Sequence, residues 1–585
     1  MNSRVPLNPK CFGLLVAYEY ERAKSFVRQL AVRIGVDVSA SATDTVDLFR
    51  FIFKLNLATF WLLQTIAGPK MQLNITPWHQ GKAGGIDLAT QLPTLPFTQQ
   101  KIPSKSVAIS CARVEVSPNG GRMSMDPKPD WSKSPDVDWS RFNRPIPTWF
   151  TDAKLGIFIH WGAYSVPAFG EPIGELGTID FKTWFKHNPY AEWYFNTIRI
   201  EGSPASAYHA EKFNNAPYDD FLDQWRAENF DAKKWAQLFS YAGAQYVVPT
   251  SKHHDGIALW DAPGTGTRNT VKRGPKKDLI GAIAAAVKKT GMHFGVYYSG
   301  GLDWGISDLP PQTTEEEVRT WRPNDPAYAM YAYQHFKDLI DKYEPEILFN
   351  DIEWPESGKR EGSYSLIELF DYFYKKIPHG VVNDRWGDHR SGGQTVHSDY
   401  RTSEYKSSLD VEDSPAWENC RGIGYSFGYN AVETKEHYIE VPALLRHFID
   451  IVSRGGNFLL NVGPTASGEI PEIQEKVLRG LGDWMKVNSE AIYGTRPIKG
   501  LTTSDTPWVR WTSKGNRIFA HIDAVGTITF QDANNLLALN KKQAGSGKIL
   551  GSGEISIMKN GDVLTFEIPN SNVVGPTVIE FTKAN

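Results

Sequence analysis

From Trp149 onward the sequence alternates short apolar runs with helical patterns, and this alternation limits the fold more than any other feature of the chain. A short buried strand followed by an amphipathic helix, repeated many times, is typical of the βα units that build a parallel sheet. The eight candidate strands are residues 155–159, 246–249, 293–298, 347–349 and 381–382, the region before Glu404, the region before Gly424, and residues 458–462. Eight such units predict an α/β fold with a (β/α)8-like TIM barrel.

The segments between these strands carry clear helix signals. Residues 231–243 begin with Asp231 as an N-cap, place apolar side chains at helical spacing and end in a glycine. Residues 278–291 repeat this design. Residues 441–452 form another amphipathic pattern, which a pair of glycines ends before the last strand. The order of strands and helices holds to about residue 490.

After Tyr493 the pattern changes to short runs in which apolar and polar residues alternate, such as residues 527–530. Turn signals such as those in residues 559–562 separate these runs, and together they predict an antiparallel β-sandwich. The sequence therefore predicts three parts. They are a leader of unknown role, residues 1–125, a (β/α)8-like barrel, residues 126–490, and a C-terminal β-sandwich, residues 491–585.

The leader differs from the rest of the chain in its charge. It holds 14 Lys and Arg against seven Asp and Glu, whereas the whole chain has a net charge of −3. Residues 48–66 are its most apolar stretch, but Arg50 and Lys54 interrupt them, and a charge at the centre of a bilayer costs about 2.5 to 3.5 kcal/mol. We therefore expect an amphipathic helix there and no membrane span. The start of the chain lacks the order of a secretory signal, which favours a cytoplasmic location.

The charge balance and the cysteine content argue against several partners. A net charge of −3 and a sequence pI near 6.6 lack the basic field of a nucleic-acid binder, so we expect no nucleic-acid partner. Cys11, Cys111 and Cys420 lie far apart and are odd in number, which argues against a disulfide framework and a Cys-based metal site. The sequence is compatible with a homo-oligomer and leaves the oligomeric state open.

Asp351 is the first candidate for chemistry because it directly follows the buried run of residues 347–349. In a parallel sheet or barrel, catalytic groups collect at the carboxyl ends of the strands. Acids after strands also cap helices or begin turns, and Asp351 alone does not separate these interpretations. The polar residues that follow the other predicted strands must decide between them.

Further polar clusters follow the other strands and would meet Asp351 at one end of a barrel. They centre on His160, on the run from His253 to Asp255, on Tyr297, on Arg385, on Glu404 and on Phe427. His253, His254 and Asp255 are standard metal ligands, so a metal-dependent hydrolase is an alternative. No further ligand recurs at a motif spacing, so we expect neither a metal nor another cofactor. Recognition of hydroxyl groups by the imidazoles fits the pattern better.

Six ordered motifs resemble the retaining α-L-fucosidases of glycoside hydrolase family 29, and the likeness runs from about Trp149 to Pro471. The motifs are residues 158–162, Phe-Ile-His-Trp-Gly; 252–256, Lys-His-His-Asp-Gly; 271–275, Val-Lys-Arg-Gly-Pro; 350–351, Asn-Asp; 383–386, Asn-Asp-Arg-Trp; and 453–464, which begin Ser-Arg-Gly-Gly-Asn. The resemblance implies a catalytic (β/α)8-like barrel followed by a β-sandwich, which agrees with the strand pattern.

Carried over position by position, the resemblance implies that Asp351 is the nucleophile and Glu404 the general acid/base. Glu418 and Glu412 are nearby rivals for the second role, and Glu418 is the stronger of these. The implied substrate-binding residues are His160, Glu192, Trp193, His253, His254, Tyr297, Arg385 and Phe427. One departure is Phe349, which stands two places before the nucleophile where some members carry Trp, and which removes an indole N–H donor.

The implied reaction explains why these residue types occur together. A fucoside is cleaved through an oxocarbenium-like transition state, and retention needs two displacements, with one carboxylate ionised and the other protonated. Fucose lacks a 6-hydroxyl, so its methyl group needs an apolar slot, for which Phe427 and Trp193 are candidate walls. The predicted function is release of α-L-fucose from fucosylated glycans or glycosides. A galactose-like sugar, the metal-dependent hydrolase and a binding module with an inactive site are the alternatives.

Overall fold

The computed structural model describes residues 137–387, 396–407, 416–532, 534–539, 545–570 and 574–584. The predicted leader with its helix at residues 48–66, and the rival acid Glu412, lie outside the described residues. In the described part of the chain, no helix is long and apolar enough to cross a bilayer.

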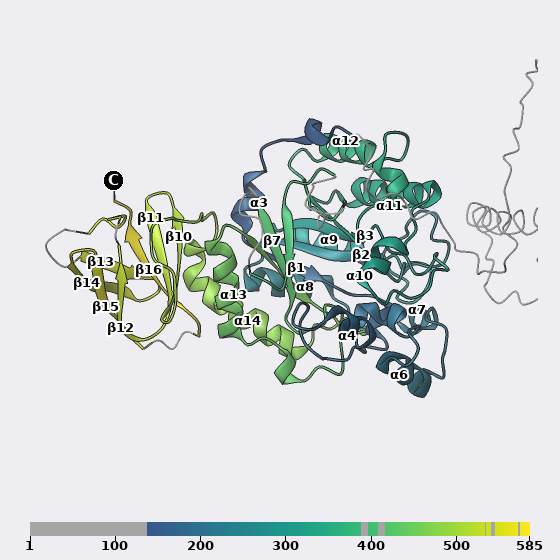
Figure 1. Cartoon of the computed structure of the whole chain (residues 1–585), viewed down its shortest axis with the longest axis horizontal. Helices are drawn as coiled ribbons and strands as arrows, with labels where there is room; N and C mark the ends of the chain where they lie inside the picture. Colours follow the sequence, from purple (N-terminus) through teal and green to yellow (C-terminus); the bar gives the residue numbers. More distant parts are fainter. Residues whose placement is uncertain are drawn as a thin grey trace, which may run out of the picture. The chain divides into compact units, whose positions relative to one another are not determined.

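The first sheet contains eight parallel strands in the order β5-β4-β3-β2-β1-β8-β7-β6 (Figure 1). Their bounds are β1 Leu155–Ile159, β2 Tyr246–Lys252, β3 His293–Ser299, β4 Ile347–Asp351, β5 Val381–Val382, β6 Arg401–Glu404, β7 Trp417–Gly422 and β8 Asn457–Val462. Every strand predicted from the sequence is present. Strands β2, β3, β4 and β6 extend further at their carboxyl ends than expected, and Asp351 and Glu404 are the last residues of β4 and β6, not members of the following loops.

Hydrogen bonds of Asp399 bridge the gap between the two outer strands of this sheet. The backbone N–H of Asp399 donates to the carbonyl of Val382 in β5 at 2.9 Å, and the Asp399 carboxylate accepts from the Val382 N–H at 2.8 Å. The sheet therefore curls back on itself between β5 and β6. This arrangement confirms the predicted (β/α)8-like barrel.

Helices lie outside the curled sheet (Figure 1). Their bounds are α3 Thr148–Ala153, α4 Phe181–Lys186, α5 Tyr194–Thr197, α6 Pro204–Phe213, α7 Asp220–Gln224, α8 Ala232–Ala242, α9 Leu279–Lys289, α10 Glu315–Thr320, α11 Pro326–Tyr343, α12 Leu366–Lys376, α13 Val441–Ser453 and α14 Glu472–Asn488. Helix α8 begins where the sequence predicted, because the Asp231 carboxylate accepts from the N–H groups of Lys233 and Lys234 at 3.0 and 3.1 Å. Gly243 ends it with a φ of 95°.

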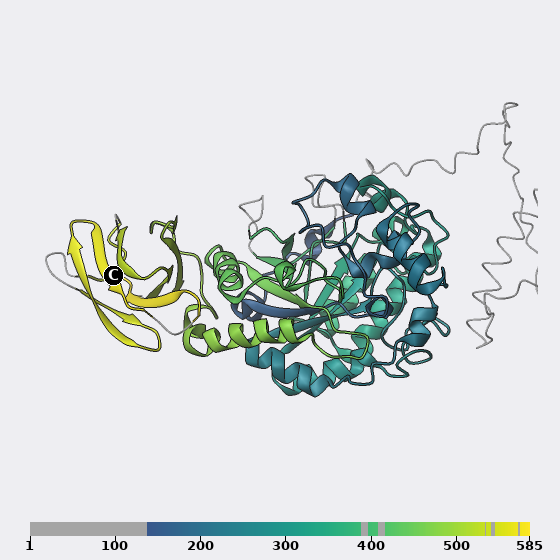
Figure 2. The same ribbon diagram turned by 90° about the horizontal axis from the view of Figure 1, so that it is seen from below.

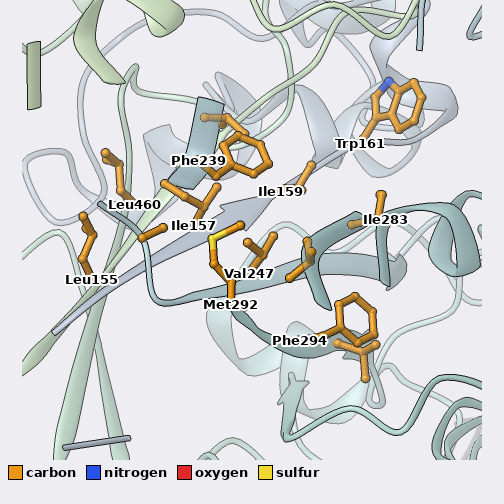
Figure 3. Packing of buried hydrophobic residues seen from close by; sticks show 14 of the residues in the cluster. Leu155, Ile157, Ile159, Trp161, Phe239, Val247, Ile283, Met292, Phe294 and Leu460 are labelled. Carbon is orange, nitrogen blue, oxygen red and sulfur yellow. The ribbon is translucent and has the colours of Figure 1, made fainter. Parts of the chain in front are cut away.

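Strands β1 and β2 are buried on both faces, as parallel strands covered by helices are, whereas the residues of β6 are half-buried. Side chains of β1 that point outward pack against the helices, and Figure 3 shows Ile157 beside Phe239 of α8. The alternate residue Phe158 belongs to a second cluster inside the barrel, together with Tyr297 and Phe349. The two-residue period of each strand thus separates an outer core from an inner one.

The C-terminal strands, yellow in Figure 2, form a second sheet system that is antiparallel throughout. Their bounds are β9 Ser504–Asp505, β10 Trp508–Lys514, β11 Arg517–Asp523, β12 Gly526–Gln531, β13 Gly545–Ile549, β14 Gly553–Asn560, β15 Val563–Ile568 and β16 Thr577–Thr582. Trp511, Phe530 and Phe566 help fill its own core. The predicted β-sandwich is therefore present. It is tied to α14 by the Trp484 indole, which donates to the Pro576 carbonyl at 2.9 Å.

Candidate active site

One cavity of about 330 Å³ collects the side chains that the sequence singled out. The predicted residues that line it are His160, Glu192, Trp193, His253, His254, Tyr297, Asp351, Arg385, Glu404 and Phe427. They lie at or near the carboxyl ends of β1 to β7, or in the long segment after β1. The barrel thus brings residues that are spread over more than 260 positions of the sequence to one end, where such folds hold their reactive groups.

Asp351 is buried at the end of β4 and is held by two donors. Arg385 Nη1 donates to its Oδ1 and the Tyr297 hydroxyl donates to its Oδ2, both at 2.9 Å. Burial raises the pKa of this carboxyl, but the charge of Arg385 and these hydrogen bonds outweigh burial and hold the pKa below its usual value. Burial also raises the pKa of Tyr297 far above its usual value, so its hydroxyl remains a donor. Asp351 is therefore an ionised carboxylate with unused lone pairs in the cavity.

Arg385 contacts both candidate carboxylates. Its Nη1 lies 2.9 Å from Asp351 and its Nη2 lies 3.3 Å from Glu404 Oε2. The remaining donor, Nε, bonds the Thr402 hydroxyl at 3.0 Å, and that hydroxyl donates to Asp384 at 2.7 Å. The planar guanidinium is thus fixed at all three nitrogens, and it fixes the two carboxylates relative to each other.

The rival acids differ in their position relative to the cavity. Glu404 lines it, and its second oxygen accepts a hydrogen bond from the Tyr190 hydroxyl at 2.8 Å. Glu418 does not line it, because it lies deeper in the barrel, where its Oε2 accepts from the Tyr246 hydroxyl at 2.5 Å. Burial raises the pKa of Glu418 to about 8. The structure therefore brings Glu404 to Asp351 and leaves Glu418 in the barrel interior.

His160 is held as a neutral acceptor by Asn461. The Asn461 amide nitrogen donates to the Phe427 carbonyl at 2.7 Å, so the amide oxygen faces His160 Nδ1, also at 2.7 Å. Nδ1 must then carry the imidazole proton. Burial lowers the pKa of His160 to about 4, so the other ring nitrogen, Nε2, keeps a lone pair.

His254 is held in the same way by Ser299. The Ser299 hydroxyl donates its single proton to the Leu302 carbonyl at 2.7 Å, so it can only accept from His254 Nδ1, which lies 2.7 Å away. Burial lowers the pKa of His254 to about 3. Its Nε2 therefore also presents a lone pair, 3.9 Å from Asp351 Oδ2. Both imidazoles are prepared to accept hydrogen bonds from hydroxyl groups of a ligand.

We expect Ser299→Ala to lower kcat/KM about tenfold. Without the Ser299 acceptor, His254 is free to move its proton to Nε2 and to donate toward Asp351 in place of accepting from a ligand, which removes about one hydrogen bond. Kinetics on a fucoside together with ¹⁵N resonances of His254 test this expectation. Ser203→Ala is the control, because Ser203 is equally buried but its hydroxyl donates to Thr197 in another part of the fold. An unchanged His254 tautomer in Ser299→Ala would contradict the assignment.

The remaining predicted residues complete the wall of the cavity. Glu192 Oε2 accepts from the Gly428 N–H at 2.7 Å, and burial raises the pKa of Glu192 to about 7. Trp193 meets the ring of His254 edge to face at 5.3 Å between centroids. His253 stacks on Tyr297 at 5.4 Å, and burial lowers its pKa well below the usual value. These groups give the cavity a polar inner end and aromatic walls.

Two further aromatic residues of the sequence have different positions relative to the cavity. Trp161, in the Phe-Ile-His-Trp-Gly motif, packs in the outer core against Trp225 and Trp235, away from the cavity. Phe349, in place of a tryptophan, lines the cavity and lies under the Arg385 guanidinium at 5.3 Å. The lost indole donor is thus replaced by a cation–π contact that supports the arginine.

The side chains that the sequence suggested as metal ligands do not point toward one common centre. Asp255 points away from His253 and His254, because its carboxylate accepts from the Tyr218 hydroxyl and the Ile257 N–H at 2.9 and 3.1 Å. Within the described ranges, no group of three or more His, Cys, Asp or Glu side chains has the arrangement of a metal site. No observation therefore favours the metal-dependent alternative.

Sequence reasoning missed several residues of the cavity, above all Tyr190 and the aromatic residues Phe181, Trp184 and Phe185. They belong to the long segment between β1 and β2, which has no repeated pattern. The aromatic density of residues 181–193 was the available signal. Cys420 also lines the cavity, with its sulfur 3.7 Å from Arg385 Nη2, and burial raises the pKa of its thiol.

Comparison with known proteins identifies the family. A family model described as alpha-L-fucosidase matches residues 129–490. The chain belongs to the α-L-fucosidase family. It is therefore a glycoside hydrolase that releases fucose, and its substrates are fucosylated glycosides. Membership favours this activity over the galactose-like and metal-dependent alternatives.

Individual α-L-fucosidases align with 66 to 75% of this chain at 32 to 42% identity. The enzyme of Dictyostelium discoideum is 33% identical over 394 residues, which cover 66% of this chain and 79% of that protein. Human tissue α-L-fucosidase is 32% identical over 402 residues, covering 67% and 77% of the two chains. A crystal structure of Thermotoga maritima α-fucosidase matches with a TM-score of 0.65 at 42% identity, over 75% of this chain and 97% of that one. The fold and the family thus agree.

Proposed function

We propose that this α-L-fucosidase acts with retention of configuration, with Asp351 as the nucleophile and Glu404 as the general acid/base. Asp351 attacks the anomeric carbon while Glu404 protonates the glycosidic oxygen, and the leaving group departs. Glu404 then removes a proton from water, which attacks the fucosyl ester and releases Asp351. Fucose is released in the anomeric form that the substrate had.

The observation that carries this proposal is the single guanidinium that contacts both carboxylates in one cavity. Retaining glycosidases keep their two carboxyl groups about 5 to 5.5 Å apart, whereas inverting enzymes separate them by about 6.5 to 9.5 Å to admit a water molecule. Bonds from two nitrogens of Arg385 to Asp351 and Glu404 support the shorter separation. The same bonds favour an ionised nucleophile, which the first step needs.

The polar inner end of the cavity suits the fucosyl ring. Neutral His160 and His254 accept hydrogen bonds at Nε2, and ring hydroxyls have protons to donate. Phe427 and Trp193 supply apolar surface for the methyl group at C5. Thermotoga maritima α-fucosidase, 41% identical with a TM-score of 0.65, has a solved structure in complex with fucose, which supports fucose binding in the corresponding barrel mouth.

We expect the loss of activity in Glu404→Ala to increase with the pKa of the leaving group, because a more basic leaving group depends more on protonation by the general acid. General acid catalysis contributes about 10²- to 10⁴-fold, so kcat/KM on a fucosyl disaccharide should fall by that factor. On an activated substrate such as 4-nitrophenyl α-L-fucoside, the rate of the glycosylation step should fall much less. Azide, which needs no general base, should accelerate breakdown of the fucosyl-enzyme and give a fucosyl azide of retained configuration. Steady-state kinetics and NMR of the azide measure both effects.

Glu418→Gln is the matched control for this experiment. The amide keeps the size of the side chain and an acceptor for the Tyr246 hydroxyl, but it cannot carry an acidic proton. We expect the activity of this variant to fall equally on the two substrates, and only by the fraction of the protein that fails to fold. If Glu418→Gln shows the leaving-group dependence and Glu404→Ala does not, the assignment of the acid/base is wrong.

A further inference from the structure

The cavity has lining residues beyond those of the polar inner end that we assign to fucose. Six apolar residues of its lining have no role in the fucose site described above: Leu176, Phe181, Trp184, Phe185, Val318 and Ile352. Charged residues line the cavity beside them, namely Glu315 and Arg319 of α10 and Glu353 after Ile352. Helix α4 contributes three of the apolar residues and helix α10 contributes Val318 (both labelled in Figure 1).

These apolar residues are connected to the side of the cavity where the leaving group must lie. A general acid must come within about 2.6 to 3.2 Å of the glycosidic oxygen, so the leaving group sits against Glu404. Tyr190 donates to Glu404 at 2.8 Å, and its ring meets Trp184 of α4 edge to face at 5.1 Å. Trp184 in turn meets Phe181 edge to face at 6.5 Å. The aromatic chain therefore runs from the acid/base to the mouth.

Helix α4 buries two of its aromatic side chains and leaves the third exposed. Trp184 and Phe185 are only 4% and 3% exposed and contact Trp193 at 5.6 and 5.9 Å between ring centroids. Phe181 is 41% exposed, although it lines the same cavity. Asp180 caps the helix by accepting from the Thr183 N–H at 3.0 Å, which fixes the start of the helix at Phe181. The cap fixes the backbone position of Phe181, and the ring of Phe181 packs against Trp184.

Ile352 lines the cavity from the turn that follows β4, directly after Asp351. It has a φ of 55°, which a β-branched residue rarely adopts, and the turn is held by the Gly300 and Gly301 N–H groups, which both donate to the Asp351 carbonyl at 3.2 Å. The strained turn places an apolar side chain directly after Asp351 in the lining of the cavity. Apolar surface therefore comes from both α4 and the turn after β4.

We propose that these residues form the leaving-group subsite, and that Phe181 is an aromatic platform for a leaving group with a flat apolar face. A pyranose ring presents such a face through its C–H groups, and an aryl ring presents one directly; the two share one recognition chemistry. This inference rests on the proposed roles of Asp351 and Glu404, because they define which side of the fucosyl ring faces α4.

The test compares Phe181→Ala with the wild-type enzyme on three fucosyl donors. They are a fucosyl disaccharide, 4-nitrophenyl α-L-fucoside, and α-L-fucosyl fluoride, whose leaving group has no face to stack. We expect kcat/KM to fall about 3- to 10-fold on the substrates with a flat leaving group, as loss of an aromatic contact predicts, and to stay within about twofold on the fluoride. Loss on the disaccharide alone or on the aryl fucoside alone also supports the platform and identifies which leaving group uses it.

Two further variants keep the test decisive. Phe181→Trp should retain activity on all three donors, because it keeps a flat ring at the same place. Tyr364→Ala removes an aromatic ring that is 40% exposed and does not line the cavity, and it should change none of the three. Equal loss by Phe181→Ala on all donors, or no loss on either flat leaving group, overturns the subsite. Activity of Asp351→Gly on all three donors would instead overturn the proposed function, so the two failures are distinguishable.

Discussion

Asp351→Gly is expected to lower kcat for hydrolysis of 4-nitrophenyl α-L-fucoside by roughly 10⁴- to 10⁶-fold, as removal of a covalent nucleophile does in other hydrolases. The glycine leaves space where the carboxylate stood, beside the donors Arg385 and Tyr297. Azide is a small anion that fits between these donors and attacks the anomeric carbon. We therefore expect azide to restore turnover and to give a fucosyl azide of inverted configuration.

The controls for this variant separate chemistry from folding. Asp308→Gly makes the same change at an exposed loop position outside the cavity, and it should leave kcat and azide dependence as in the wild type. The thermal unfolding midpoint of both variants shows whether the fold is intact. Full activity of Asp351→Gly without azide would mean that another group is the nucleophile.

Arg385→Met should move the acidic limb of the pH dependence of kcat/KM upward by about one to three units and lower activity at every pH. Burial alone raises the pKa of Asp351, and the charge of Arg385 is the main influence that lowers it. The reactive form of Asp351 is ionised, so activity is lost as the pH falls through its pKa. Removing Arg385 raises that pKa, and the loss therefore begins at a higher pH.

Arg385→Lys is the matched comparison. Lysine keeps the positive charge but has one nitrogen, so it cannot reach Asp351, Glu404 and Thr402 together. We expect an acidic limb close to that of the wild type with a lower kcat, because the charge remains and the relative placement of the carboxylates is lost. An acidic limb that stays fixed in Arg385→Met would show that the arginine does not set the ionisation of Asp351.

The barrel could be predicted from sequence because its strands satisfy two demands at once. A parallel strand with helices outside and a packed interior must be apolar on both faces, so β1 and the first three residues of β4 appear as unbroken apolar runs. Caps such as Asp231 and Gly243 mark where the intervening helix begins and ends. The weakest strand was β5, only two residues long, and it was recognisable from the polar cluster after it.

The choice between Glu404 and Glu418 depends on strand register, which the sequence does not contain. In the sheet, Glu404 of β6 pairs with Cys420 of β7, while Glu418 pairs with Thr402. Glu418 therefore lies two residues deeper, about 6.6 Å at the rise of a parallel strand, on the side of the barrel interior. Glu404 ends β6, whereas Glu418 is the second of the six residues of β7, and the sequence alone did not show where either strand begins or ends.

The outer part of the site was beyond prediction for a different reason. Tyr190 and Phe181 lie in the long segment that separates β1 from β2, where short helices follow no common period. Tyr190 is placed by its hydrogen bond to Glu404, which is far away in the sequence, and Phe181 packs against Trp184, whose ring contacts Trp193. Likewise, the tautomers of His160 and His254 follow from Asn461 and Ser299, whose roles appear only once the hydrogen bonds are known.

The most direct test of the account is to trap the covalent intermediate and locate it by mass spectrometry. A 2-deoxy-2-fluoro-fucosyl fluoride forms the fucosyl-enzyme faster than water releases it, because the 2-fluoro group destabilises both oxocarbenium-like transition states while the good fluoride leaving group keeps the first step fast. Trypsin should yield the peptide from Tyr343 to Lys359, which carries Asp351, and a separate peptide from Thr402 to Lys406, which carries Glu404. We predict one fluorofucosyl group on the first peptide, placed on Asp351 by fragmentation. A label on Glu404 or on another peptide would contradict the proposed nucleophile.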